Sequence, residues 1–300
     1  MTQNSSASPF QGVYTALVTP LKADGKVAFD ELTRLVEWQI ESGIDGLIPA
    51  GTTGESPTLD PQEHIDVIRC VVDAAAGRVP VIAGAGANAT AEAIHLTKGA
   101  DKAGANGFLQ VSPYYNKPSQ EGQFQHFSAI ADLSDKPIIL YSIPGRCVVE
   151  IGVETVVRLA DKYPHVRTIK ESGGTVVRAS QLIHALGDRI TILSGEDERT
   201  LPYISVGASG VISVASNIAP KLVKEMVDSA LAGDLKTATR VHQKLFPLFR
   251  DLFCETSPAP IKYALKRKGI LSTPQTRLPL VPITSAGAQQ LDQTLSALGL

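Results

Sequence analysis

The chain has 300 residues, 43% of them hydrophobic, and a formal net charge of −2. Its length suits one large domain or two smaller ones. The near-neutral charge, with no long run of either sign, argues against a nucleic-acid partner held through its phosphates. Its three cysteines lie far apart, so neither a zinc motif nor a disulfide framework is predicted. No apolar run reaches ~18 residues and residues 1–9 do not resemble a signal peptide, so we expect a cytoplasmic protein.

Short apolar segments and helical segments alternate along most of the chain. Eight strands are predicted, at 13–20, 46–50, 80–83, 107–111, 137–142, 166–170, 190–194 and 210–214. Helices are predicted between them, for example at 30–40, 61–76, 153–162 and 176–186. Asp60 is expected to cap one of these helices, because a proline at the first helical position follows it.

The regular alternation of strands and helices predicts a TIM (β/α)8 barrel. Strands that are apolar throughout are typical of parallel sheets covered on both faces. An open, doubly wound sheet is the alternative, since periodicity alone does not close a barrel. Further helices without strands are predicted at 221–232, 235–253, 259–268 and 286–298. We therefore expect a flexible tail (1–10), a catalytic barrel (11–220) and a C-terminal helical domain (221–300).

Polar side chains gather where the predicted strands end, which is the catalytic face of a parallel barrel. They are Thr52, Thr53, Tyr114, Tyr115, Tyr141, Arg146, Lys170 and Glu196, the last following Gly195. The set combines an amine, hydroxyls that can relay protons, and a guanidinium suited to a carboxylate. For any one tyrosine taken alone, a structural hydrogen bond is the preferred interpretation, and it is the combination of side chains that indicates a site.

Lys170 is the strongest catalytic candidate. It ends the sixth predicted strand and precedes a turn, Glu171-Ser-Gly-Gly174. A lysine in that position can attack a carbonyl substrate if its pKa falls from ~10.4 through burial or a neighbouring cation. The ordinary alternative is a solvated surface side chain.

Other motifs do not support a cofactor or a metal. Residues 84–89 match the G-x-G-x-x-A pattern, but on the third strand and without the acidic residue that dinucleotide sites use. Small residues that permit close helix packing are the preferred interpretation. The six histidines show no metal-binding spacing, and Cys147 has no histidine partner in view.

Five motifs together resemble the dihydrodipicolinate synthase / N-acetylneuraminate lyase family. They lie at 51–56, 112–116, 141–146, 169–171 and 210–213, in the family's order and spacing. The resemblance runs from about residue 12 to the C-terminus. It implies a TIM barrel with a helical C-terminal domain, assembled as a homotetramer or a homodimer, and an enzyme that needs no cofactor.

The resemblance implies a Schiff-base lyase of the synthase branch. Such an enzyme condenses pyruvate with L-aspartate 4-semialdehyde in the diaminopimelate route to L-lysine. Lys170 would form the Schiff base, and Tyr141 would be the acid and base, linked through Thr52 to Tyr115. The substrate-binding residues would be Thr53, Arg146, Gly195 and Ile212. Ser142 departs from the common asparagine, but strand alternation should turn it away from the site.

The resemblance further implies feedback inhibition by L-lysine at a site between subunits. The matching residues are Ser56, His64, Asn88, Glu92 and Tyr114, while Pro61 replaces a histidine common in sensitive bacterial enzymes. Two alternatives to the synthase remain at this point. One is a pyruvate-dependent aldolase acting on a sugar acid, sialic acid or 4-hydroxy-2-oxoglutarate, and the other is a non-catalytic barrel that binds a small molecule.

Overall fold

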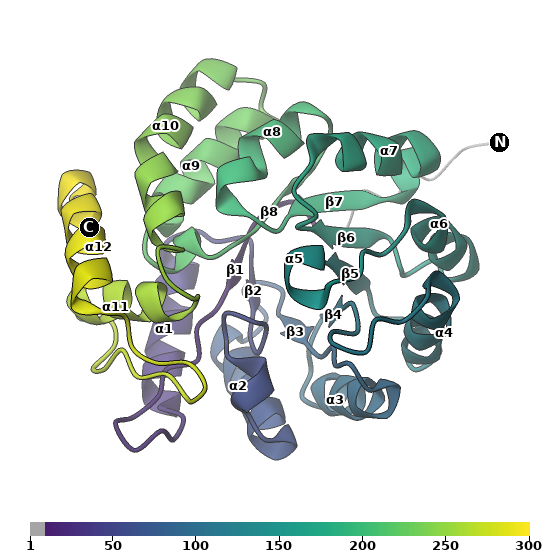
Figure 1. Cartoon of the computed structure of the whole chain (residues 1–300), viewed down its shortest axis with the longest axis horizontal. Helices are drawn as coiled ribbons and strands as arrows, with labels where there is room; N and C mark the ends of the chain where they lie inside the picture. Colours follow the sequence, from purple (N-terminus) through teal and green to yellow (C-terminus); the bar gives the residue numbers. More distant parts are fainter. Residues whose placement is uncertain (1–9) are drawn as a thin grey trace.

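The computed structural model describes residues 10–300 and contains eight parallel strands ringed by helices (Figure 1). Of the predicted flexible tail (1–10), residues 1–9 lie outside the described residues. The strands are β1 (Gly12–Ala16), β2 (Gly46–Ile48), β3 (Ile82–Gly84), β4 (Gly107–Val111), β5 (Ile138–Ser142), β6 (Thr168–Glu171), β7 (Thr191–Ser194) and β8 (Gly210–Ser213). The helices between them are α1 (Phe29–Glu41), α2 (Pro61–Ala75), α3 (Thr90–Lys102), α4 (Gln120–Ala131), α5 (Pro144–Cys147), α6 (Val153–Lys162), α7 (Val176–Leu186) and α8 (Thr200–Ser205).

The sheet closes into a barrel, as predicted. Neighbouring strands follow the order β2-β1-β8-β7-β6-β5-β4-β3. Its two ends meet through a parallel bridge between Leu47 and Val81, supported by a 3.0 Å hydrogen bond from the Leu47 N–H to the Pro80 carbonyl. An open sheet is therefore excluded, and all eight strands direct their carboxyl ends to one face.

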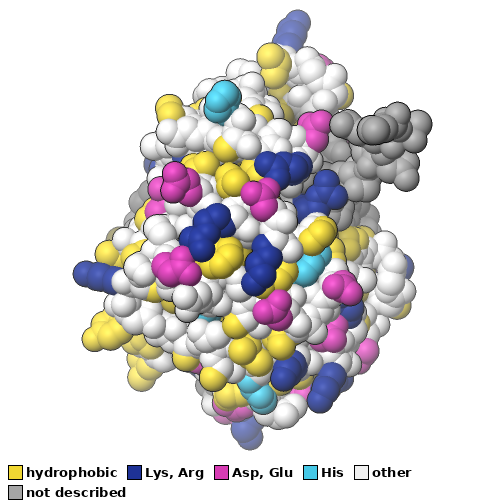
Figure 2. All heavy atoms as spheres, turned by 90° about the vertical axis from the view of Figure 1, so that its right-hand side faces the viewer, with side chains coloured by type: hydrophobic (Ala, Val, Ile, Leu, Met, Phe, Trp, Pro, Cys, Tyr) yellow, Lys and Arg dark blue, Asp and Glu magenta, His cyan; other side chains and the backbone are white. Residues whose placement is uncertain are grey.

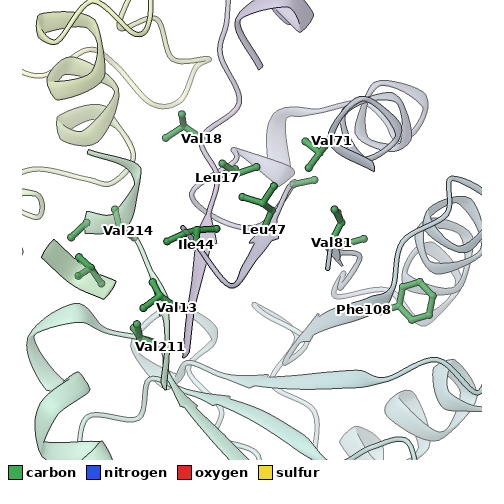
Figure 3. Close-up of a cluster of buried hydrophobic side chains, with 14 of the residues drawn as sticks. Val13, Leu17, Val18, Ile44, Leu47, Val71, Val81, Phe108, Val211 and Val214 are labelled. Carbon is green, nitrogen blue, oxygen red and sulfur yellow. The ribbon is translucent and has the colours of Figure 1, made fainter. Parts of the chain in front are cut away.

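Two apolar layers hold the barrel together. The outer layer lies between strands and helices and includes Val13, Leu47, Val81 and Phe108, which are buried (Figure 3). The inner layer fills the barrel and consists of Phe10, Tyr14, Ala16, Ile48, Ile82, Leu109, Ile139, Tyr141, Leu193 and Ile212. Because side chains alternate along each strand, seven of these strands contribute to both layers, whereas β6 contributes only Ile169, to the outer layer.

Phe10 corrects the predicted extent of the tail. Its ring is only 3% exposed and contacts Tyr14 edge-to-face, with ring centroids 5.7 Å apart. An aromatic side chain of this size is stabilised by filling the end of the barrel. The ordered domain therefore includes residue 10.

The small-residue motif at 84–89 serves packing between backbones. A Cβ added to Gly84 would lie 2.4 Å from the Ala50 carbonyl oxygen, and one added to Gly86 would lie 2.4 Å from the Val111 nitrogen. Both glycines are therefore required by the close approach of neighbouring barrel segments. The sequence-based interpretation, in which these small residues allow a helix to pack closely, is therefore wrong, because the atoms nearest to Gly84 and Gly86 belong mainly to the backbone of neighbouring barrel segments.

Four longer helices follow β8, close to the predicted ranges. They are α9 (Pro220–Leu231), α10 (Leu235–Asp251), α11 (Ala259–Arg267) and α12 (Ser285–Leu298). Helix α9 packs on β1 and β8 and so covers the barrel, α10 packs on α9, and α12 packs on α10 and α11 (Figure 1). Helix α9 begins at Pro220, one residue before the boundary expected at residue 221. The short α8 was not predicted, because six residues with an internal proline give no helical period.

Charged side chains of both signs are interspersed on the surface. Figure 2 shows this for the described part of the face formed by α4, α6 and α7. Among residues 10–300, no helix is both long and apolar enough to cross a membrane.

Candidate active site

Two neighbouring strands, β5 and β6, bring the predicted catalytic residues Tyr141 and Lys170 to one level inside the barrel. In the parallel register, Tyr141 on β5 pairs with Lys170 on β6, which in turn pairs with Leu193 on β7. Ser142, one residue further along β5, points the other way, and its Oγ accepts a 3.3 Å hydrogen bond from the Ile151 N–H. The expectation that Ser142 faces away from the site is confirmed.

Lys170 and Tyr141 are in direct contact. The Lys170 Nζ lies 4.1 Å from the centroid of the Tyr141 ring, and only 7% of Lys170 is exposed. Burial lowers the pKa of Lys170 to about 7; the Arg146 charge also lowers it, whereas Asp197 and Glu196 oppose the shift. A substantial fraction of this amine is therefore neutral near neutral pH, as a nucleophile requires.

Tyr141 keeps its proton in the resting site. Burial raises the pKa of its hydroxyl, and the nearby Arg146 charge only partly offsets this effect. A protonated phenol beside a neutral amine can donate a proton to a carbonyl oxygen under attack.

A cavity of about 760 Å³ opens over these two residues. Seven of the residues predicted at the strand ends line it, namely Thr52, Thr53, Tyr141, Arg146, Lys170, Gly195 and Glu196. Gly195 permits this arrangement, because an added Cβ would lie 3.0 Å from the Lys170 Cε and 1.9 Å from the Ser172 Oγ. The pattern of strand ends thus predicted the inner wall of the cavity correctly.

The outer wall of the cavity was not predicted from the sequence. It is formed by Phe249, Arg250, Phe253, Glu255, Thr256 and Ser257, from the end of α10 and the segment after it. These residues are far in sequence from the strand ends and carry no motif. Only their position in the folded chain identifies them.

Asp197 is a further site residue that the sequence analysis did not single out. Its buried carboxylate accepts hydrogen bonds from the Val214 and Ala215 N–H groups at 3.0 and 2.9 Å and from the Ser213 Oγ at 2.5 Å. It lines the cavity and acts electrostatically on Lys170. Asp197 could have been found from the sequence by its position, because it lies two residues after Gly195 at the end of a predicted strand.

A smaller cavity of about 210 Å³ adjoins the first and shares Thr52, Tyr141 and Arg146 with it. Ser56 and Tyr114, two residues of the expected L-lysine site, also line it. Burial raises the pKa of Tyr114, and the Glu92 charge adds to that effect.

The other residues of the expected L-lysine site lie nearby. The His64 Nε2 is 2.6 Å from the Gly84 carbonyl oxygen, and burial lowers the pKa of His64 while the Glu92 charge opposes that shift. The Asn88 carbonyl accepts a 2.9 Å hydrogen bond from the Asn116 side chain. The five residues thus form one neighbourhood beside the barrel mouth.

Two of the predicted catalytic and substrate-binding residues, Tyr115 and Ile212, lie outside both cavities. Tyr115 is 88% exposed and has a left-handed backbone, with φ of 72°. Ile212 is 1% exposed and belongs to the inner layer of the barrel, together with Tyr141 and Leu193. Neither residue reaches the catalytic cavity through its own side chain in the isolated chain.

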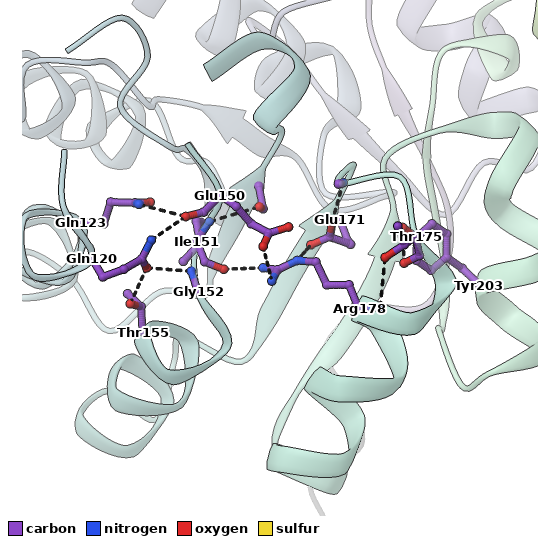
Figure 4. A network of polar contacts seen from close by, with 12 residues as sticks. Gln120, Gln123, Glu150, Ile151, Gly152, Thr155, Glu171, Thr175, Arg178 and Tyr203 are labelled. Carbon is purple, nitrogen blue, oxygen red and sulfur yellow. Dashed lines mark hydrogen bonds and ion pairs between the residues drawn. The ribbon is translucent and has the colours of Figure 1, made fainter. Parts of the chain in front are cut away.

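A buried ion-pair network supports the end of β6 (Figure 4). The Arg178 Nε donates to the Glu171 carboxylate at 2.7 Å, and the same guanidinium binds the Ile151 carbonyl and pairs with Glu150 at 3.2 Å. Glu171 follows Lys170 directly and also accepts a 2.5 Å hydrogen bond from the Gly173 N–H. The network therefore links the strand that carries Lys170 to the segment after α5, the helix that carries Arg146.

Among the described residues, no group of three or more histidine, cysteine, aspartate or glutamate side chains is arranged to hold a metal ion.

Comparisons with known proteins identify the family. Residues 9–298 match the dihydrodipicolinate synthetase family. A 4-hydroxy-tetrahydrodipicolinate synthase from Psychrobacter sp. is 50% identical, over 97% of this chain and 95% of its own length. The solved structure of dihydrodipicolinate synthase from Acinetobacter baumannii, complexed with pyruvate, is 44% identical with a TM-score of 0.93, covering 96% of this chain and 99% of that one. The enzyme from Cyanidioschyzon merolae, solved with lysine bound, is 41% identical with a TM-score of 0.93, covering 97% and 99%.

The chain is a Schiff-base-forming lyase built on a TIM barrel, and it belongs to the dihydrodipicolinate synthetase family. Its activity is that of the 4-hydroxy-tetrahydrodipicolinate synthases, enzymes of lysine biosynthesis. The aldolase and non-catalytic alternatives left open by the sequence are thereby set aside.

Replacing Arg178 with methionine tests the support beneath Lys170. The variant leaves the Glu171 carboxylate buried without its cation, so we expect a loss of about 3–5 kcal/mol in the free energy of unfolding. Burial already raises the pKa of Glu171. A folded-state pKa above the unfolded one favours folding at low pH, so the loss should grow as pH rises above ~4.3.

Urea denaturation at pH 5 and pH 8 measures both effects. Arg189→Met is the matched control, because Arg189 pairs with Asp161 at the surface, where an ion pair contributes about 0–1 kcal/mol. A loss at Arg178 no larger than at Arg189 would show that the network does not support the site.

Proposed function

We propose that the enzyme condenses pyruvate with L-aspartate 4-semialdehyde, and that Lys170 forms the Schiff base with pyruvate. The observation that carries this proposal is the buried Lys170 amine, with a pKa lowered to about 7, in contact with the Tyr141 ring at the base of the cavity. The pyruvate complex of the Acinetobacter baumannii relative supports the choice of keto acid.

The reaction begins when the neutral Lys170 amine attacks the keto carbon of pyruvate. Tyr141 donates a proton to the carbonyl oxygen, water leaves, and a protonated Schiff base remains. Loss of a proton from the methyl group gives an enamine, whose carbon attacks the aldehyde of the second substrate. The amino group of that substrate then displaces Lys170, which closes the ring and frees the enzyme.

Thr52 and Tyr115 complete the proposed proton relay with Tyr141. Thr52 lines both cavities, whereas Tyr115 projects into solvent from the isolated chain. We therefore propose a homotetramer or homodimer in which Tyr115 enters the site of the neighbouring subunit. An exposed aromatic side chain on a constrained loop supports this arrangement.

The substrate carboxylates have separate binding groups in the proposal. Thr53 and Thr52 hold the pyruvate carboxylate beside Lys170, with Gly195 leaving room for the adduct. Arg146, at the cavity mouth, holds the carboxylate of the semialdehyde. Ile212 belongs to the apolar interior of the barrel, and in the proposal it supports the substrate-binding site from within the barrel.

L-Lysine is the proposed inhibitor, bound where Ser56 and Tyr114 line the smaller cavity. Glu92 would receive an ammonium group, and Asn88 with Tyr114 a carboxylate. The lysine-bound Cyanidioschyzon merolae relative supports this assignment. A cytoplasmic location completes the proposal, supported by three free cysteines, Cys70, Cys147 and Cys254.

Borohydride reduction in the presence of pyruvate tests the central step. We expect a covalent adduct on Lys170, detected by mass spectrometry, and none in Lys170→Ala. Because the neutral amine is the nucleophile, the rate of adduct formation should rise with pH to half its maximum at about 7 and then level off. A rate still rising above pH 9 would show that Lys170 keeps an ordinary pKa, and absence of an adduct would refute the proposed reaction.

Arg146→Ala tests recognition of the semialdehyde. Loss of a charge-assisted hydrogen bond, worth about 1.5–3 kcal/mol, should raise the KM for this substrate roughly tenfold to a hundredfold while the pyruvate adduct still forms. Arg250→Ala is the control, because Arg250 also lines the cavity but pairs with Asp251. Equal effects of the two substitutions in a coupled steady-state assay would disprove the specific role of Arg146.

Isothermal titration calorimetry with L-lysine tests the regulatory site. We expect heat of binding for the unaltered protein and its loss in Glu92→Gln, because the ammonium group then lacks its countercharge. Glu154→Gln changes an equivalent first-turn glutamate on α6 and should leave binding intact. No heat at millimolar L-lysine would contradict the regulatory proposal.

A further inference from the structure

The loop that carries Thr52 and Thr53 has an unusual backbone. It follows β2 and runs through Glu55, which adopts left-handed dihedral angles, φ 59° and ψ 33°. A non-glycine residue keeps this conformation only where surrounding contacts impose it. The contacts at Glu55 therefore determine the shape of the loop.

Glu55 forms a buried ion pair with Lys262 on α11. Their side chains are 1% and 0% exposed, and the Lys262 Nζ donates to the Glu55 Oε1. The second carboxylate oxygen, Oε2, accepts a 2.9 Å hydrogen bond from the Arg277 N–H. Both partners belong to the chain that follows α10, so the C-terminal region holds both carboxylate oxygens of this one loop residue.

Lys262 is itself held in place. Its Nζ also donates to the Gln275 carbonyl at 2.8 Å, which fixes the segment after α11. In that segment the Arg277 guanidinium binds the Glu63 carboxylate at 2.7 Å and the Gly25 carbonyl at 2.9 Å. Figure 1 shows this segment returning from α11 toward α2. The Lys262 ammonium, which pairs with Glu55, thus has a fixed position relative to the barrel.

The position of Glu55 is transmitted to the threonines over a few bonds. The Glu55 N–H donates to the Thr52 carbonyl at 3.1 Å. On the other side, the Thr19 Oγ1 donates to the Gly54 carbonyl at 2.7 Å. The loop is therefore held at two residues: Gly54 is bound by Thr19, in the segment after β1, and Glu55 is bound by the C-terminal region. Thr52 and Thr53 lie between the end of β2 and these two held residues.

We propose that Lys262, acting through Glu55, is a positioning residue that presents Thr52 and Thr53 to the pyruvate carboxylate. Neither Lys262 nor Glu55 lines either cavity, so both act without contacting the substrate. The inference rests on the proposed binding of pyruvate by this loop. It gives the C-terminal helical region a part in catalysis in addition to its part in the cavity wall.

The energetics of a buried ion pair favour such a role. Desolvation of two buried charges can offset most of their attraction, and hydrophobic residues of similar volume are often equally stabilising in such positions. An ion pair with fixed hydrogen-bond geometry instead gives the loop that contains Glu55 a defined position. When substrate-binding groups are displaced by about 1 Å, the reaction rate can fall ~10²-fold.

Steady-state kinetics of Lys262→Met, Glu55→Gln and the double variant test the proposal. We expect each single variant to raise the KM for pyruvate at least about tenfold, with kcat at saturating pyruvate changed much less. The double variant should be no worse than the worse single variant, because the two residues act as one unit. The pyruvate concentration that gives half-maximal borohydride trapping on Lys170 should shift in parallel.

Leu291→Ala is the control for general loosening of the C-terminal region. Leu291 on α12 is fully buried, so this variant loses stability without touching the pair. Its KM for pyruvate should stay unchanged. The proposal fails if Leu291→Ala raises the KM as much as Lys262→Met, or if the pair variants leave it unchanged. If Lys262→Met does not fold, the isosteric Glu55→Gln decides alone. Failure of the unaltered protein to trap pyruvate would instead refute the proposed function.

Discussion

Burial of one ammonium group is the constraint on which the site depends. Lys170 lies inside the barrel beside Tyr141, where water cannot solvate its charge, so its pKa falls to about 7. The same burial raises the pKa of the Tyr141 hydroxyl. A single physical effect therefore prepares a nucleophile and a proton donor next to each other, with no metal required by the proposed reaction. Lys170 is only 7% exposed and lies beside Tyr141 and Leu193 of the inner apolar layer, which limits the hydration of its charge.

Rigid connections keep these groups in register with the substrate-binding side chains. Arg178 ties the end of β6 to the segment after α5, and Lys262 ties the loop after β2 to α11. Both cations are buried and both bind a glutamate close in sequence to site residues: Glu171 follows Lys170 directly, and Glu55 lies two residues after Thr53. The catalytic face is thus fixed from outside the cavity by charged pairs, while the cavity itself stays open to substrate.

The fold and the inner half of the site followed from sequence because both depend on local, repeating signals. Eight apolar segments alternating with helices indicate parallel strands, and the ends of such strands meet on one face, which placed Lys170, Tyr141 and Arg146 together. Most of the functional assignment came from the resemblance of five motifs. The contributions of Phe253, Lys262 and Arg277 could not be found in this way, because tertiary contacts over long sequence separations leave no periodic signal. Phe10 was misassigned because a single aromatic residue at the end of a polar segment does not reveal that a barrel end will cover it.

The distance along the chain between paired groups has a consequence for how the enzyme matures. Glu55 and Lys262 are 207 residues apart, and Arg277 N lies 222 residues from the same carboxylate. During synthesis the barrel strands all emerge before Lys262 does. A nascent chain can therefore assemble its eight strands and still lack the cation that sets the loop after β2. The loop after β2 can therefore take its final position only after the segment that contains Lys262 and Arg277 has been synthesised, so closure of the barrel and completion of this loop are separate steps.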